Sequence, residues 1–291
     1  MPELRSVLCP VDRSDVSRQA LRAAVSLASA HHAPLHVVEV VDSAFPPLAD
    51  PTAVLQVQDV ARQTLEEDVN WFVAPLLTAN VTTSVHVREG RVVTEILRMA
   101  ADLESPLIVM GTHGRGGFER FVLGSVTEKI VRKASCPVLA VPPSEGDSGL
   151  ALKRIVCAVD FSPASAAAFA FAQLLAMPAS ANVALLHVLE WPFGDTDAPA
   201  PVLALRHNLE AEAQEHLLRL ETRPGARIAE RVVRVGKPAR DIQAFARDRA
   251  ADLIVLGSSG RGAVNQAVLG STAHAVLRDA PCAVLTVPVA G

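Results

Sequence analysis

The sequence predicts an α/β protein built from two tandem domains, each an open and mostly parallel sheet with helices on both faces. Two observations support this prediction. The chain repeats itself after about one domain length, and within each copy short apolar runs alternate with stretches of helical periodicity. A length of 291 residues also fits two domains of ordinary size.

The repeat is visible in four pairs of segments. From Asp12 to Asp160 the spacing is 148 residues, which is that of a whole domain rather than of a solenoid unit. We expect a first domain over residues 1–143, an exposed linker over 144–150 and a second domain over 151–291. The matched pairs are Leu8–Asp12 with Val156–Asp160, Leu35–Glu39 with Leu186–Glu190, Pro106–Gly111 with Asp252–Gly257, and Ser135–Leu139 with Pro281–Leu285.

The expected strands are short runs rich in Val, Ile and Leu. Several of these runs are continuous rather than alternating, which is typical of strands buried on both faces of a parallel sheet. In the first copy they are Val7–Val11, Leu35–Val41, Val81–Val87, Leu107–Met110 and Val138–Val141.

Helical patterns lie between the strands. The first, Asp15–His31, places Ala20, Ala24 and Leu27 at helical spacing. A Pro-rich segment follows the second strand of each copy and is either a lid or a plain connector. The other expected helices are Gln56–Leu77, Val92–Leu103 and Val126–Ala134, with Arg240–Arg249 and Thr272–Asp279 in the second copy.

Composition excludes several classes of protein. A net charge of −4 without a basic stripe argues against nonspecific nucleic-acid binding. The sequence has no run of 18 apolar residues, the length that would span a membrane, and its N-terminus lacks the pattern of a signal peptide. We therefore expect a cytoplasmic protein. The four cysteines form no C-x-x-C pair, which favours small buried residues over a disulfide or zinc framework.

A glycine-rich loop follows the fourth strand of each copy. Both loops fit G-x-x-G, nine residues, G-S, from Gly111 to Ser125 and from Gly257 to Ser271. Glycines allow close backbone approach, and exposed N–H groups in the loop and at the next helix start favour phosphate. Each serine either donates to the phosphate or caps the helix. The pattern predicts phosphate binding, with empty structural turns as the alternative.

An aspartate ends the first strand of each copy. Ligands of open α/β sheets sit at the carboxyl ends of the strands, where Asp12 and Asp160 could accept from a ribose hydroxyl or an adenine amine. Both also precede a helix in an Asp-x-Ser pattern, so a capping role is equally compatible with the sequence.

Taken together, these motifs resemble the universal stress protein family. The Asp-x-Ser, the His-Val of the second strand, the glycine motif and the final Cys-Pro-Val-Leu and Cys-Ala-Val-Leu carry the resemblance over nearly the whole chain. The glycine motif is that of the ATP-binding branch. The resemblance implies two five-stranded sheets of order 3-2-1-4-5. It also implies ATP, with or without Mg²⁺, in each domain, and a regulatory stress-response role exerted through assembly or partners.

The resemblance also implies the ligand contacts, with adenine near the first two strands and ribose and phosphates on the glycine motif. Arg115 and Arg261 either contact phosphate or remain solvated. The second copy has Ser259 and Ala273 in place of His113 and Thr127, which removes polar groups from positions close to the expected phosphates. The expected contacts are Asp12, Val37, Gly111, Gly114, Arg115, Gly116, Gly124, Ser125, Val126 and Thr127, then Asp160, Val188, Gly257, Gly260, Arg261, Gly262, Gly270, Ser271 and Thr272.

Catalytic signatures are missing from the sequence. There is no G-x-x-x-x-G-K-[ST] motif and no nucleophile–His–acid order. We expect no catalytic or metal-ligating residue and at most slow ATP hydrolysis. The alternatives are a slow ATP hydrolase or nucleotidyl-transferring enzyme of the adenine-nucleotide α-hydrolase-like fold, and a structural interaction domain that binds nothing.

The resemblance also predicts how the domains associate, because universal stress proteins commonly pair two domains through the fifth strand. Val138–Val141 and Val284–Val287 would then be edge strands, and each ends at a proline. We expect the two halves to pair within one chain, and such chains to form a homodimer. No nucleic-acid or membrane partner is expected.

Overall fold

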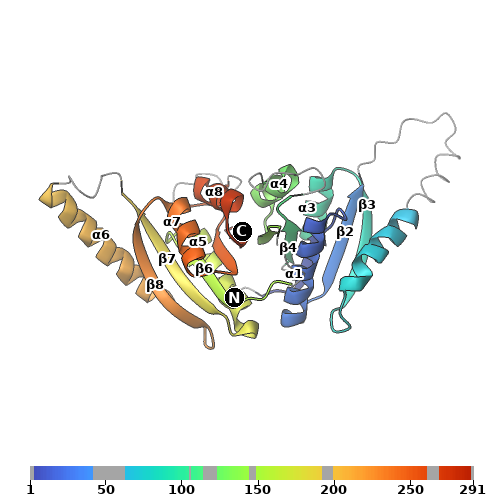
Figure 1. Ribbon diagram of the computed structural model, residues 1–291, viewed down its shortest axis with the longest axis horizontal. Helices are drawn as coiled ribbons and strands as arrows, with labels where there is room; N and C mark the ends of the chain where they lie inside the picture. Colours follow the sequence, from blue (N-terminus) through green and yellow to red (C-terminus); the bar gives the residue numbers. More distant parts are fainter. Residues whose placement is uncertain are drawn as a thin grey trace. The chain divides into compact units, whose positions relative to one another are not determined.

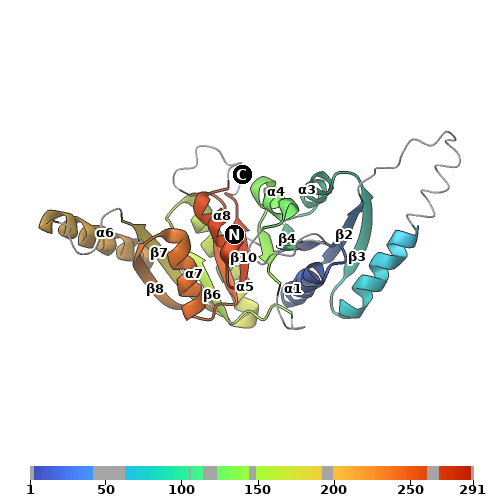
Figure 2. The same ribbon diagram turned by 45° about the horizontal axis from the view of Figure 1, so that its top comes forward.

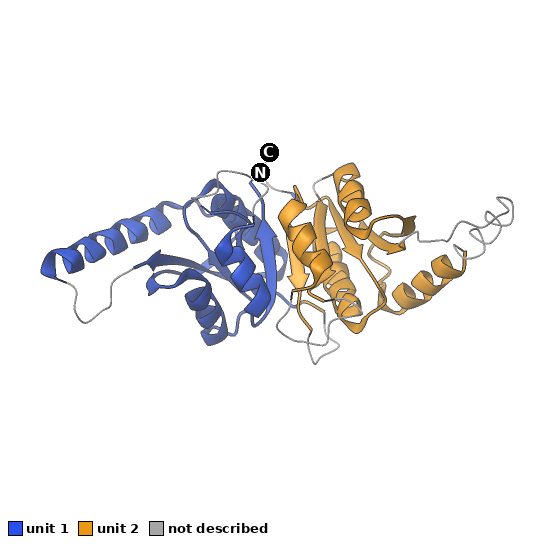
Figure 3. Cartoon of the chain, turned by 90° about the horizontal axis from the view of Figure 1, so that it is seen from above, with its two compact units in different colours: residues 1–3, 151–291 blue, residues 4–150 orange. Residues whose placement is uncertain are grey.

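The computed structural model describes residues 3–41, 63–104, 106–113, 123–143, 149–191, 199–260 and 269–289. Residues 4–150 and residues 151–291 each belong to one compact unit (Figure 3). Residues 144–148 of the expected linker lie outside the described part, so the domain boundaries stay a prediction.

The first domain is a parallel sheet of order β3-β2-β1-β4-β5, with β1 in the middle (Figure 1). The predicted strand order 3-2-1-4-5 is therefore confirmed. The strands are β1 (Ser6–Pro10), β2 (Leu35–Val41), β3 (Thr83–Glu89), β4 (Pro106–Gly111) and β5 (Val138–Val141).

The second domain repeats this topology in the order β8-β7-β6-β9-β10, again with every described pairing parallel. The α/β fold class is therefore confirmed in both halves. The strands are β6 (Arg154–Ala158), β7 (Asn182–Glu190), β8 (Arg227–Gly236), β9 (Leu253–Gly257) and β10 (Ala283–Val287).

Helices cover both faces of each sheet (Figure 2). In the first domain α1 contacts β1 and β4, whereas α3 contacts β2 and packs against α4. Of the expected helix Gln56–Leu77, residues 63–73 are helical and 56–62 lie outside the described residues. The remaining helices are α1 (Asp15–His31), η1 (Ala74–Leu76), α3 (Val92–Asp102), α4 (Ser125–Lys133), α5 (Pro163–Ala179), α6 (Ala200–Arg219), α7 (Pro238–Asp248) and α8 (Ser271–Asp279).

Local signals explain where the first helix of each domain begins and ends. The Ser14 side chain caps α1 by accepting from the Ser17 N–H, and Ser162 caps α5 in the same way. Each helix then ends at a residue in the left-handed conformation, His32 or Ser180. The apolar face between these ends is buried against the sheet.

The core of each domain is formed by its central strands, whose apolar side chains are almost fully buried. Cys9 and Cys157 belong to these strands, and burial raises the pKa of both thiols. All four cysteines are free, and no helix among the described residues is long and apolar enough to cross a membrane.

The strand register corrects the alignment of the two copies. Cys9 pairs with Val37, and its counterpart Cys157 pairs with Leu185. The second strands therefore align with the same 148-residue spacing as the first strands, three residues away from the alignment suggested by the two His-Val dipeptides. Val37 lies inside the sheet and is fully buried. Val40, at the strand end, is the counterpart of Val188.

Candidate functional site

The second domain contains a cavity of about 710 Å³ at the carboxyl ends of its strands. The cavity lies at the end of β6, the strand that has β7 on one side and β9 on the other. Here the strand order reverses, and ligands of open α/β sheets bind at such a point. The cavity brings together every expected second-domain contact that the structure describes: Asp160, Val188, Gly257, Gly260, Gly270, Ser271 and Thr272. Arg261 and Gly262 lie outside the described residues.

The sequence did not indicate several other residues of the cavity lining. Pro238 and Ile242 reach it from the first turns of α7, and Leu256 from the end of β9, so apolar side chains line part of the cavity. Glu190, at the end of β7, adds a second acidic residue to the lining, which also includes Asp160. The signal for α7 was its position after the third strand, where the crossover helix returns over the sheet.

Apart from Val37, the expected first-domain contacts that the structure describes lie at the corresponding strand ends. Asp12 follows β1, Gly111 ends β4, Gly124 is the N-cap of α4, and residues 125–127 form the first turn of that helix. Val37 is not at this edge, as its register shows. Gly114, Arg115 and Gly116 lie outside the described residues.

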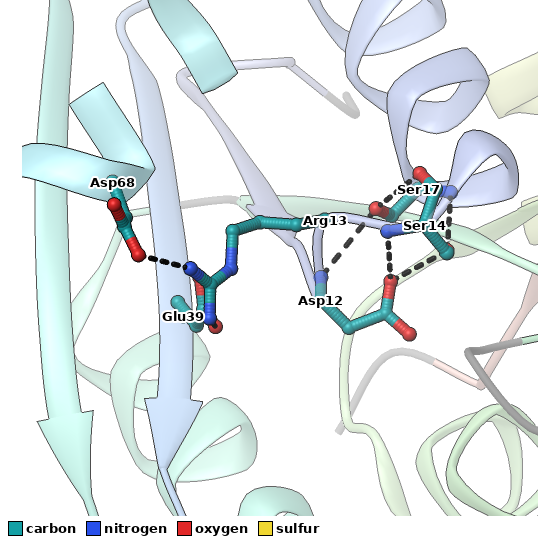
Figure 4. Close-up of polar contacts among 6 residues, drawn as sticks. All are labelled: Asp12, Arg13, Ser14, Ser17, Glu39 and Asp68. Atoms are coloured by element: carbon teal, nitrogen blue, oxygen red, sulfur yellow. Dashed lines mark hydrogen bonds and ion pairs between the residues drawn. The ribbon is translucent and has the colours of Figure 1, made fainter. Parts of the chain in front are cut away.

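Each aspartate orders the turn that it belongs to. Asp12 Oδ1 accepts from the Ser14 backbone N–H at 3.1 Å and from the Ser14 hydroxyl at 2.6 Å (Figure 4). Asp160 makes the same two contacts with Ser162, at 3.0 and 2.5 Å. The helix cap is therefore the serine, and the aspartate holds the serine in place. Asp160 lines the cavity at the same time.

The helices that follow the glycine loops begin without a side-chain cap. Gly124 and Gly270 are the N-cap residues, and neither Ser125 nor Ser271 caps its helix. The N–H groups of Gly124 and Gly270 donate to Thr112 and Ser258 carbonyls at 2.7 and 2.8 Å. The next three N–H groups of each helix have no intrahelical acceptor, and the helix dipole favours an anion there.

The glycines of the motif serve different purposes. A Cβ on Gly111 would stand 2.7 Å from Val16 of α1, and one on Gly257 would stand 2.8 Å from Ala164 of α5, so these two glycines allow a helix to pack closely. At Gly124 a Cβ would stand 2.9 Å from the Thr112 carbonyl oxygen. Gly260 lies against the candidate site, because its Cβ would stand 2.9 Å from Asp160 Oδ2.

The polar residues that differ between the copies bond to their own domain. The Thr127 hydroxyl donates to the Gly111 carbonyl at 2.8 Å, and His113 Nδ1 lies 2.8 Å from the Thr112 hydroxyl. Replacing Thr127 by alanine, as in Ala273, therefore removes a bond that closes the turn between β4 and α4. Among the described residues, no group of three or more His, Cys, Asp or Glu side chains could hold a metal ion.

The comparisons with known proteins agree with this architecture. A family model described as "Universal stress protein family" matches residues 3–142 and 151–288. A universal stress protein of Mycolicibacterium smegmatis is 29% identical over 289 residues, which cover 97% of this chain and 96% of that protein. One of Methanocaldococcus jannaschii is 32% identical over 138 residues, 47% of this chain and 81% of that protein.

A solved structure shows the same fold over the full length. The crystal structure of a universal stress protein from Archaeoglobus fulgidus superposes with a TM-score of 0.69 at 23% identity, covering 98% of both chains.

Proposed function

The chain belongs to the universal stress protein family, and we propose that it is a stress-related regulatory protein that binds ATP in each of its two domains. The observation that carries this proposal is the second-domain cavity, where seven expected contacts from four separate segments meet. Its volume of about 710 Å³ lies within the range of small-molecule sites, about 300–1,000 Å³.

The features of the cavity fit the parts of a nucleotide. The open start of α8 offers backbone N–H groups for phosphate oxygens. Asp160 would accept from a ribose hydroxyl or from the amine of the base. Val188 and Ile242 supply an apolar wall for a flat base.

Mg²⁺ would complete the charge balance of the second site. The described lining includes the carboxylates of Asp160 and Glu190 but no Lys or Arg, and a triphosphate adds further negative charge. Mg²⁺ commonly binds between one or two carboxylates and substrate phosphates, and it would offset this repulsion.

The first domain supports a second site through its matching geometry. Its Asp12 turn and its uncapped α4 have the same local bonds as their counterparts in the second domain. At the strand edge the residue for the adenine contact would be Val40, the counterpart of Val188.

Thermal unfolding with and without ATP tests the proposal. ATP with Mg²⁺ at about 100 times its dissociation constant should stabilise each domain by about 2.7 kcal/mol. No shift in melting temperature, with protein shown to be nucleotide-free, would contradict ATP binding. A steady-state turnover of about 1 s⁻¹ or faster, which is within about tenfold of the typical enzyme median of about 10 s⁻¹, would instead identify an enzyme.

We further propose that the two domains pair within one chain through β5 and β10, and that such chains form a homodimer. Each strand would be the last in its own domain's order, where an uncovered edge favours pairing. A short linker raises the effective concentration to the millimolar range, about 1 mM, so a modest interface would close. Expressing residues 1–146 and 150–291 separately tests this: monomeric halves that form no complex on mixing would contradict it.

A further inference from the structure

The residue that follows each site aspartate has an unfavourable backbone conformation. Arg13 and Phe161 both have φ of 62°. For a bulky side chain this left-handed conformation is strained, so contacts elsewhere must hold it. Both side chains make such contacts. In each domain the partners are one residue of the second strand and one residue of the second helix.

In the first domain these contacts are ion pairs. The Arg13 guanidinium lies 3.1 Å from Glu39 on β2 and 2.8 Å from Asp68 on the helix over residues 63–73 (Figure 4). The Glu39 side chain is only 8% exposed, which makes its pairing with Arg13 a buried one. We call Arg13, Glu39 and Asp68 the first anchor.

In the second domain these contacts are between rings. The Phe161 ring lies 4.7 Å from the His187 ring on β7 and 5.2 Å from the His216 ring on α6, centroid to centroid. His187 Nδ1 also lies 2.7 Å from the Val159 carbonyl oxygen, to which it donates, so the ring is fixed in orientation. We call Phe161, His187 and His216 the second anchor.

The two anchors occupy equivalent positions. Each residue of the second anchor lies 148 residues after its counterpart in the first, the spacing that also relates Asp12 to Asp160 and the first two strands of each domain. One chain thus holds the same turn in two chemically different ways, once by charge and once by aromatic and imidazole rings. A site that needs a fixed turn would require an anchor but not a particular chemistry.

From this arrangement we propose that Arg13 and Phe161 are positioning residues for nucleotide binding, and that the two anchors fix the Asp12 and Asp160 turns to the second strand and second helix of their domains. The inference rests on the proposed function, because the position of the aspartate matters only if the site binds nucleotide. The lining of the second-domain cavity includes His187 but neither Phe161 nor His216. Arg13, the counterpart of Phe161, would therefore act on affinity without touching the ligand.

Isothermal titration of the full chain with ATP and Mg²⁺ tests this proposal. A Gly260→Val background would block the second site, so that the titration reports the first site alone. Arg13→Met should weaken ATP binding by about tenfold or more. Arg13→Met with Glu39→Gln removes both charges of the buried pair, so it keeps the test valid where the single variant fails to fold.

Rescue distinguishes positioning from mere stability. The triple variant Arg13→Phe, Glu39→His, Asp68→His builds the second anchor into the first domain, and it should restore affinity to within about threefold of the parent. Arg5→Met is the matched control, since Arg5 forms an exposed ion pair with Glu104 just before β1, at the opposite end of that strand. Its affinity should be unchanged.

The outcomes separate the two proposals. If neither the wild-type chain nor the Gly260→Val parent binds ATP, the proposed function fails, and this inference fails with it. If the parent binds ATP and the folded Arg13 variants bind equally well, only the anchor proposal is overturned. It is also overturned if the folded triple variant binds as weakly as Arg13→Met.

Discussion

Gly260 lies against Asp160 so closely that a Cβ on the glycine would stand 2.9 Å from the carboxylate Oδ2. The two residues come from segments 100 positions apart, the glycine loop after β9 and the turn after β6. Their contact joins the two motifs that the sequence suggested separately, and it places both on one cavity.

Gly260→Val should abolish ATP binding at the second site and leave the first site intact. The branched side chain would displace the Asp160 carboxylate and fill part of the cavity. Titration of the full chain should therefore show one bound ATP instead of two. Normal binding at both sites would mean that the loop is only a structural turn.

The two N-cap glycines should differ in their tolerance of alanine. A Cβ on Gly124 would stand 2.9 Å from the Thr112 carbonyl oxygen, whereas one on Gly270 would meet nothing closer than 3.5 Å. Gly124→Ala should thus cost about 1–3 kcal/mol more than Gly270→Ala through overpacking, since the N-cap preference is common to both. Urea unfolding measures the difference, and equal stabilities would argue against the close approach at Gly124.

Thr127→Ala should lower stability without changing ATP affinity. The Thr127 hydroxyl donates to the Gly111 carbonyl, and such a bond contributes about 1 kcal/mol to folding. Melting temperature and ATP titration on the same variant check both parts. A large loss of affinity would show that the hydroxyl contacts the ligand. The second site, which has Ala273 at this position, would then be expected to bind ATP more weakly than the first.

Acid should destabilise the first domain through two stacked histidines. The rings of His36 on β2 and His86 on β3 lie 5.7 Å apart. Burial lowers the pKa of both histidines, and the charges of His36 and Arg88 lower that of His86 further. Because the folded state then binds fewer protons than the unfolded state, stability falls as pH drops through about 6.5.

Replacing the pair by its second-domain counterparts tests this pH dependence. The strand register equates His36 with Ala184 and His86 with Val232. The double variant His36→Ala, His86→Val should lose less stability than wild type between about pH 7.5 and about pH 5.5. Urea midpoints followed by circular dichroism, for wild type and the double variant at each pH, give the comparison. If the urea midpoints of wild type and the double variant change equally with pH, the role of the pair is refuted.

Much of the fold follows from the sequence, because its local signals are strong. The bounds of β2, β5 and α1 match those expected, since Val-rich runs mark the two strands and the Ser14 cap marks the start of the helix. The expected strand Val81–Val87 begins two residues before β3. The side chains of β3 are half-buried or exposed, so no buried run marks where this strand begins. Strand ends of this kind depend on the partner strand rather than on the run itself.

Other features depend on contacts that a single sequence does not display. The alignment of Val37 with Val188 followed a repeated His-Val dipeptide, but the backbone pairing makes Val40 the counterpart of Val188. The anchors share no residue type between the copies, so the repeat gave no sign of Arg13 and Phe161. Their equivalence becomes visible only when the ion pairs and ring contacts are placed on the two strands.

Native mass spectrometry of the freshly purified chain with added ATP and Mg²⁺ tests the central claim most directly. The account predicts one chain carrying the mass of two ATP molecules, falling to one in the Gly260→Val variant. A chain that retains no nucleotide at millimolar ATP would contradict the account.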